Sequence, residues 1–234
     1  MIEESLSEKR KRLSELILEK GFDCLDDKEL LDYYLCLSTG GASSKKASEN
    51  LFDCFKNLDG IMKKEARYLR TVDDVSDLNA VYLALVNDMR CKMYAQRNEN
   101  IKYLKDIEKR KQYAHNLLYP YGYERIVLIK LSRNMRVLSF ELVSKGGVNF
   151  SQTSPASFAK ILSIDKPEYI IVAHNHPESL CNPSVQDITF TNKLRDLATQ
   201  FNCTLVDHII VGQDKEFSFD EMGLITRPIQ RNIK

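Results

Sequence analysis

The sequence predicts an α+β protein with a helical first part and a second part in which strands and helices alternate. Residues 1–112 are rich in Leu, Lys, Glu and Asp, contain few β-branched residues, and place apolar side chains at helical spacing. After Tyr119-Pro120-Tyr121-Gly122, short apolar runs alternate with amphipathic stretches. We therefore expect a helical N-terminal domain over 1–112 and an α/β domain with a mixed central sheet over 113–234.

In the first part, acidic residues and apolar periodicity mark the helices. Asp26, Asp27 and Glu29 precede a Leu-rich run, and acidic side chains favour the positive end of a helix dipole. The expected helices cover 5–20, 26–39, 44–55, 63–69 and 78–98, and Gly40-Gly41 ends the second of them.

In the second part, two apolar runs joined by a polar turn predict a β-hairpin over 126–131 and 136–143. The fully apolar run 169–173 is typical of a central strand. Helices are expected over 155–162 and 184–200, and a further strand over 204–211.

The charge balance limits the classes of function. The chain has 34 Lys and Arg against 33 Asp and Glu, which excludes a strongly basic nucleic-acid binder as a description of the whole chain. The basic clusters Lys9–Arg12 and 102–111 are interpreted as solvated helix faces, with a docking role for nucleic acid or protein left open.

The compartment is inferred from the absence of a membrane-spanning run, of a basic leader and of paired cysteines. No apolar run has the roughly 18–20 residues that span a bilayer, and the start Met1–Glu4 is acidic rather than basic. The six cysteines form no CxxC pair, so we interpret them as reduced thiols. We expect a cytoplasmic protein with no membrane partner.

The most informative motif follows the central strand. In Ala173-His174-Asn175-His176-Pro177 the two histidines point to the same side because side chains alternate along a strand. Ser184 and Asp187 complete the pattern H-x-H-x7-S-x2-D. Two imidazoles and a carboxylate suit zinc and leave a fourth position for water. Ser184 and Asp187 equally fit a helix capping box that involves no metal.

This pattern resembles the JAMM motif of the MPN+ (JAB domain) metallopeptidases. The run His-Asn-His-Pro, the strand Leu205–Gly212 with its Asp-His pair, and Ser218-Phe219 followed by Gly223 are similar to the RadC-like branch. In the first part, Asp27–Leu31 and Ser38-Thr39-Gly40 are similar to the same branch. The resemblance implies an MPN (JAB)-type fold behind a degenerate helix-hairpin-helix-like domain.

The resemblance also implies roles for individual residues. His174, His176 and Asp187 would bind Zn²⁺, and Ser184 would hydrogen-bond a ligand or the developing oxyanion. Glu141, five residues before Gly146, matches the family's general base; its alternative interpretation is an exposed strand residue. His208 is interpreted as structural, and His115 receives no role.

The implied function is a zinc metallopeptidase that cleaves a peptide or isopeptide bond in a peptide or protein substrate. The alternative is a DNA-repair-associated accessory protein that uses the same fold for binding. Against DNA binding, the family's Gly-x-Gly hairpin is replaced by Val75–Ala80, with Asp73, Asp74 and Asp77 nearby. A third possibility is a scaffold that retains a zinc site without turnover. The oligomeric state is not predicted.

Overall fold

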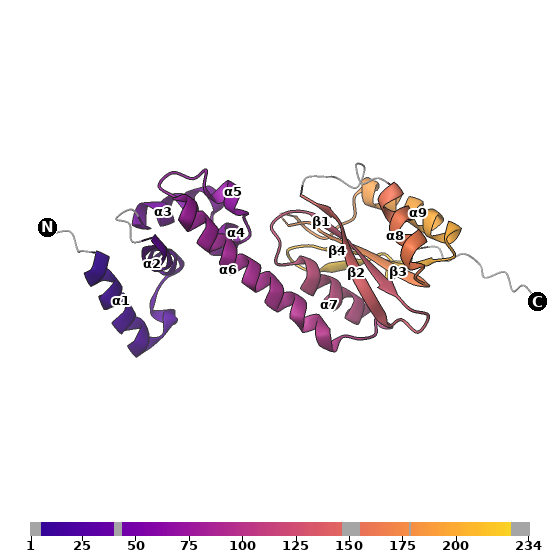
Figure 1. Ribbon diagram of the computed structural model, residues 1–234, viewed down its shortest axis with the longest axis horizontal. Helices are drawn as coiled ribbons and strands as arrows, with labels where there is room; N and C mark the ends of the chain where they lie inside the picture. Colours follow the sequence, from indigo (N-terminus) through magenta and orange to yellow (C-terminus); the bar gives the residue numbers. More distant parts are fainter. Residues whose placement is uncertain (1–5, 40–43, 147–154, 178, 226–234) are drawn as a thin grey trace, which may run out of the picture. The chain divides into compact units, whose positions relative to one another are not determined.

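The computed structural model describes residues 6–39, 44–146, 155–177 and 179–225. The chain splits into two compact units, Met1–Arg90 and Cys91–Lys234; Figure 1 gives the element labels. The domain boundary expected from the sequence, after residue 112, falls inside a helix of the second unit. Residues of this helix before and after the expected boundary contact the sheet of the second unit or its C-terminal segment. The Gly40-Gly41 stop and the acidic start of the chain lie outside the described residues.

The first unit is helical, as predicted, around a core that includes Leu35, Leu51, Ile61 and Leu83. Its helices are α1 (Leu6–Lys20), the short 3-10 helix η1 (Phe22–Cys24), α2 (Asp27–Thr39), α3 (Ser44–Phe55), α4 (Leu58–Met62), α5 (Ala66–Leu69) and the first part of α6 (Asp77–Gln96).

The helix expected over 63–69 is shorter than predicted, since α5 covers only Ala66–Leu69. A further short helix that was not predicted, α4, precedes it. Asn57 caps α4, and its side chain accepts a 2.7 Å hydrogen bond from the Gly60 backbone N–H.

The second unit contains a mixed five-stranded sheet with the strand order β2-β1-β3-β4-β5. Strands β3 and β4 are parallel and the other neighbouring pairs are antiparallel. The elements are η2 (Arg97–Asn100), α7 (Ile107–Leu118), β1 (Arg125–Leu131), β2 (Val137–Lys145), α8 (Pro155–Asp165), β3 (Tyr169–Asn175), α9 (Val185–Gln200), β4 (Thr204–Val211) and β5 (Glu216–Ser218).

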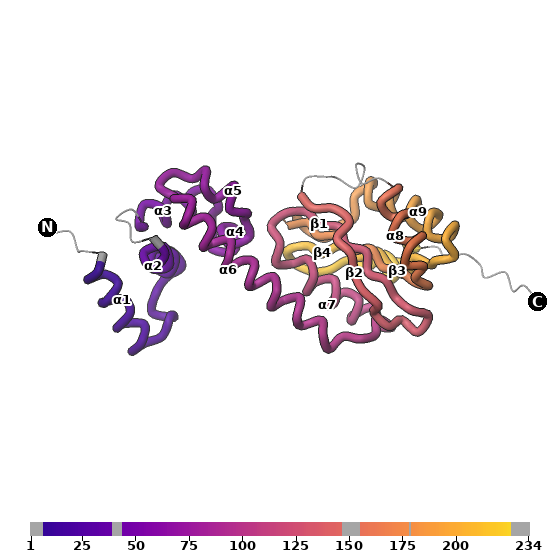
Figure 2. Tube along the Cα trace, in the orientation of Figure 1, coloured from indigo at the N-terminus to yellow at the C-terminus, as the bar shows by residue number. Residues whose placement is uncertain are grey.

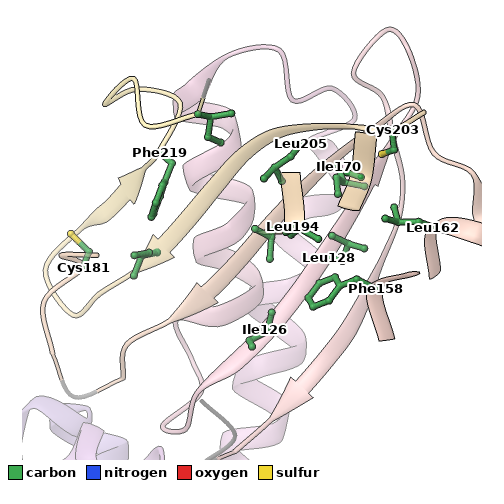
Figure 3. Packing of buried hydrophobic residues seen from close by; sticks show 14 residues of the cluster. Ile126, Leu128, Phe158, Leu162, Ile170, Cys181, Leu194, Cys203, Leu205 and Phe219 are labelled. Carbon is green, nitrogen blue, oxygen red and sulfur yellow. The ribbon is translucent and has the colours of Figure 1, made fainter. Parts of the chain in front are cut away.

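Helices cover both faces of the sheet, which explains the continuous apolar runs in β1, β3 and β4. Leu117 and Leu118 of α7 pack with alternate strand residues such as Val127 and Ile129 on one face. On the other face α8 and α9 lie side by side (Figure 2). Figure 3 shows the core beneath them, in which Phe158, Leu162 and Leu194 meet Leu128, Ile170 and Leu205.

The basic stretch 102–111 is not simply a solvated helix face. Helix α7 begins only at Ile107, and Arg110 is 6% exposed. Its guanidinium lies 2.8 Å from Asp220 and 3.5 Å from Asp207, so this cation ties α7 to the end of the sheet. The sequence did not reveal these partners because they lie far along the chain.

None of the helices in the described ranges combines the length and apolar character needed to cross a bilayer. No disulfide joins the six cysteines, all of which lie among the described residues.

Candidate metal centre

The two motif histidines lie at the end of β3. Asn175, between them, anchors this end of the strand to the segment that leads into β1. Its amide oxygen accepts the Arg125 backbone N–H at 2.8 Å, and its amide nitrogen donates to the carbonyls of Tyr121 and Tyr123 at 3.1 Å. Asn175 is 2% exposed and satisfied by these bonds. It therefore fixes the backbone that presents His174 and His176 on the opposite side.

His176 is held by two backbone carbonyls. Its backbone N–H donates to Val211 at 2.9 Å, and its Nδ1 lies 3.1 Å from the Leu180 carbonyl oxygen. Since a carbonyl oxygen only accepts, Nδ1 carries a proton, and in the neutral ring Nε2 then presents a lone pair. A backbone carbonyl in this position is the usual orienting partner of a metal-binding histidine.

Asp187 and Ser184 form the capping box that starts α9. The Ser184 hydroxyl and backbone N–H each donate to Asp187 Oδ2 at 2.7 Å, and the Asp187 N–H donates to Ser184 Oγ at 3.1 Å. The other carboxylate oxygen, Oδ1, lies 3.4 Å from His174 Nε2. The capping box and the candidate metal ligand are thus the same residues, and neither interpretation excludes the other.

Three potential ligand atoms converge at this point. The Nε2 atoms of His174 and His176 are 2.9 Å apart, and the ligand atoms of both histidines and Asp187 all lie within 4.8 Å of one another. His174 and Asp187 are 2% and 3% exposed, whereas the side chain of His176 is 16% exposed. Two imidazoles and a carboxylate with an accessible side fit a tetrahedral zinc site with an open position.

The electrostatics of the cluster favour neutral histidines. Burial lowers the pKa of His174 well below its ordinary value, and the neighbouring His176 lowers it further. Burial, followed by the neighbouring His174, likewise lowers the pKa of His208. Because metal binding needs the unprotonated imidazole, this environment prepares His174 for a cation.

His208 and Thr191 join the cluster from β4 and α9. His208 is fully buried, its Nε2 lies 2.9 Å from His174 Nδ1, and its Nδ1 lies 2.6 Å from Thr191 Oγ1. The ring is stacked on Phe219 at 4.5 Å between centroids. Sequence reasoning missed Thr191, although its spacing of four residues from Asp187 places both on one helix face.

Asp207, which precedes His208 in β4, has a structural role. Asp207 is fully buried and accepts hydrogen bonds from the Ser218 hydroxyl at 2.8 and 2.9 Å and from the Asp220 N–H at 3.1 Å. It thereby locks β4 to the segment that carries Phe219.

Glu141 does not join the ligand cluster. Glu141 pairs with Leu128 of β1, which pairs with Val172 of β3. Glu141 therefore lies on the same face of the sheet as Val172 and His174. It is two strands away from β3, however, a distance of roughly 10 Å. Its carboxylate contacts Lys130 Nζ at 2.5 Å, and the same Nζ contacts Asp165 at 2.5 Å. Burial alone would lower the pKa of Lys130, but hydrogen bonds to Asp165 and Glu141 raise it.

Comparisons with known proteins give a family match and several relatives. The family described as RadC-like JAB domain matches residues 104–224. The chain is 30% identical to the UPF0758 protein FN0909 of Fusobacterium nucleatum subsp. nucleatum over 225 residues, which is 92% of this chain and 96% of that protein. It is also similar to the UPF0758 protein NMB1038 of Neisseria meningitidis serogroup B, with 27% identity over 92% of this chain and 95% of the relative. A UPF0758 protein of Shewanella halifaxensis is 24% identical over 90% of this chain and 94% of its own length.

Proposed function

The chain belongs to the RadC-like JAB domain family, and from this premise we propose that it is a zinc-dependent metallohydrolase that cleaves a peptide or isopeptide bond. The observation that carries the proposal is the convergence of two histidine Nε2 atoms and the Asp187 carboxylate within 4.8 Å. An open side next to three protein ligands is typical of catalytic rather than structural zinc.

His174, His176 and Asp187 are the residues that would hold the metal. A zinc ion bound by three side chains supplies Lewis-acid chemistry, lowering the pKa of water to roughly 7 and polarising a carbonyl. Ser184 orients Asp187 through two hydrogen bonds to Oδ2. We propose that its hydroxyl also stabilises the oxyanion that develops on the substrate.

Glu141 is our proposed proton carrier, in line with its match to the family motif. In the present arrangement its carboxylate is held by Lys130, so this role requires the side chain to leave that ion pair and turn along the sheet face. The proposal for Glu141 is therefore tested separately from the proposal for the metal.

The substrate class is a peptide or protein, and the compartment is the cytoplasm. The DNA-associated alternative has less support, because acidic side chains surround the N-terminus of α6, the position at which a DNA phosphate would bind. Ser76 caps this helix with Asn79, and Asp73, Asp74 and Asp77 lie beside the cap. Carboxylates at a helix N-terminus repel a phosphate that the backbone N–H groups would otherwise attract.

The metal is tested by its content in protein purified without added metal, compared between wild type and His176→Ala. The matched control is His115→Ala, since His115 lies on α7 and contacts Glu216 rather than the cluster. We expect about one zinc per chain in wild type and control and none in His176→Ala. Equal zinc in all three proteins, or none in any of them after zinc is supplied, contradicts the proposal.

The reaction is tested on the zinc-loaded protein with a panel of peptide and isopeptide substrates. A hydrolytic rate that depends on His176 and falls at least 100-fold in Glu141→Gln is expected if Glu141 moves the proton. A full rate in Glu141→Gln removes Glu141 from the mechanism while leaving the metal site in place. Steeply salt-dependent duplex binding without hydrolysis favours the DNA-associated alternative instead.

A further inference from the structure

We infer that Thr191 and His208 form a positioning relay that holds the ring proton of His174 on Nδ1, so that His174 Nε2 presents its lone pair to a metal ion. The relay runs from the backbone carbonyl of one candidate ligand, Asp187, to the ring of another, His174. The metal-binding part of this inference rests on the proposed function, whereas the proton positions follow from hydrogen-bond geometry alone.

The direction of the relay is fixed at its first step. Thr191 Oγ1 lies 2.6 Å from the Asp187 carbonyl oxygen and 2.6 Å from His208 Nδ1. A carbonyl oxygen has no proton to give, so the single hydroxyl proton of Thr191 is donated to Asp187. Thr191 Oγ1 is then an acceptor toward His208, and His208 Nδ1 must carry a proton.

The second step transfers this constraint to the ligand. With its proton on Nδ1, a neutral His208 has an unprotonated Nε2, which lies 2.9 Å from His174 Nδ1. His174 Nδ1 must donate there, because two lone pairs facing each other at this distance repel. A neutral His174 then has no proton on Nε2.

The arrangement at the other end of the relay suits a cation. In its neutral form His176 also has an unprotonated Nε2, because its Nδ1 donates to the Leu180 carbonyl. Two ring lone pairs therefore face each other at 2.9 Å with the Asp187 carboxylate beside them. A metal ion shared by the three groups would remove this repulsion, and the relay keeps the ring proton of His174 away from that position.

Packing keeps the central ring of the relay in one orientation. His208 is stacked on Phe219 with 18° between the planes, and Phe190 meets it edge-on at 6.1 Å. Phe219 follows Ser218, which is bound to Asp207, so the Asp-His and Ser-Phe pairs of the sequence both serve to hold this ring. His208 is thus a positioning residue rather than a spacer in the core.

The proton positions are tested directly by NMR of zinc-free, 15N-labelled protein at neutral pH, using long-range correlations of the imidazole nitrogens. We expect His174 and His208 of the wild type to carry their protons on Nδ1. In Thr191→Val, which keeps the shape but lacks the hydroxyl, we expect His208 and then His174 to move to the Nε2–H form. Thr191→Ser retains the hydroxyl and should keep the wild-type pattern. A wild-type His174 with its proton on Nε2 overturns the inference.

The consequence for the metal is tested by zinc affinity in competition with a chelator, with the thermal stability of each zinc-free variant measured alongside. Loss of an outer partner of a ligand typically costs 10–100-fold in affinity, which is what we expect for Thr191→Val and His208→Leu. Two variants should keep a zinc affinity within about threefold of that of the wild type, because each keeps the relay. They are Thr191→Ser and His208→Gln, in which the amide oxygen takes the place of Nε2. A purely structural role would instead lower stability in the variants and leave zinc affinity unchanged.

The two proposals fail in distinguishable ways. If His174 carries its proton on Nδ1 but the wild type binds no zinc, the proposed function is wrong and the hydrogen-bond relay stands without a metal. If the wild type binds zinc and Thr191→Val binds it equally well, the metal site stands and the positioning role is wrong.

Discussion

Ser184 donates its hydroxyl and its backbone N–H to the same oxygen of Asp187, Oδ2, at 2.7 Å each. This leaves Oδ1 directed at His174 Nε2, 3.4 Å away. A helix cap therefore orients a candidate metal ligand.

Removing this cap should affect both stability and metal binding. We expect Ser184→Ala to lower the free energy of unfolding by about 1 kcal/mol, because an N-cap is lost, and to weaken zinc binding because Asp187 is less constrained. Chemical denaturation and chelator competition measure the two effects. Thr189→Ala is the control, since the Thr189 hydroxyl only bonds the Val185 carbonyl within α9. Equal behaviour of the two variants would contradict the dual role.

The close approach of Gly212 to the loop before α9 gives a second prediction. A Cβ at Gly212 would lie 2.5 Å from the backbone nitrogen of Cys181. This nitrogen belongs to the Leu180–Cys181 peptide group, whose carbonyl oxygen accepts the hydrogen bond from His176 Nδ1. Gly212→Ala should therefore displace this peptide, cost about 1–3 kcal/mol in stability and weaken zinc binding.

Cys181→Ala separates the effect of the peptide from that of the buried thiol. This variant removes the thiol and leaves the Leu180–Cys181 peptide in place, so its zinc affinity should equal that of the wild type. Gly212→Ala with unchanged zinc affinity would show that the peptide does not orient His176.

Asp207 is expected to be the most sensitive structural carboxylate in the second unit. Burial raises the pKa of Asp207, so its ionised form depends on Ser218, the Asp220 N–H and Arg110. Removing one member of a buried ionic network typically costs 3–5 kcal/mol, and we expect Asp207→Ala to fall in about that range by urea denaturation. The exposed Asp196→Ala should change stability by less than about 0.5 kcal/mol. A loss at Asp207 no larger than at Asp196 contradicts this assignment.

The contact between His115 and Glu216 predicts a contribution to stability that disappears in acid. A hydrogen bond with His115 at 2.5 Å lowers the pKa of Glu216. A carboxyl whose pKa is lower in the folded state stabilises the fold above its unfolded pKa of about 4.3, and this stabilisation is lost as the pH falls through the folded value.

Glu216→Gln measures this contribution. At pH 7 the variant should be less stable by up to about 1 kcal/mol, and the difference from the wild type should shrink as the pH falls below about 4.3. Thermal unfolding of both proteins across this range checks the sign. A difference that grows as the pH falls would show that the pKa of Glu216 is raised.

Most elements and the candidate ligand set follow from local sequence signals. The apolar run 169–173 predicted the buried strand β3, and the spacing of His174, His176, Ser184 and Asp187 brought together the residues that meet in space. The short helix α4 was not predicted, because its start is marked by a single cap, Asn57, rather than by an apolar period. The burial of Arg110 was not foreseen, since its partner Asp220 lies 110 residues away.

The sequence by itself determined the fold class, because periodicity is a property of neighbouring residues. Its candidate ligand motif indicated the family through resemblance to a known pattern. Only the tertiary structure decided which atoms face each other. It assigned the two oxygens of Asp187 to different partners, brought Thr191 and His208 behind His174, and placed Glu141 beside Lys130. The physical reason is that hydrogen-bond direction and strand register depend on groups far apart in the chain, and these become fixed only when the sheet and its helices pack.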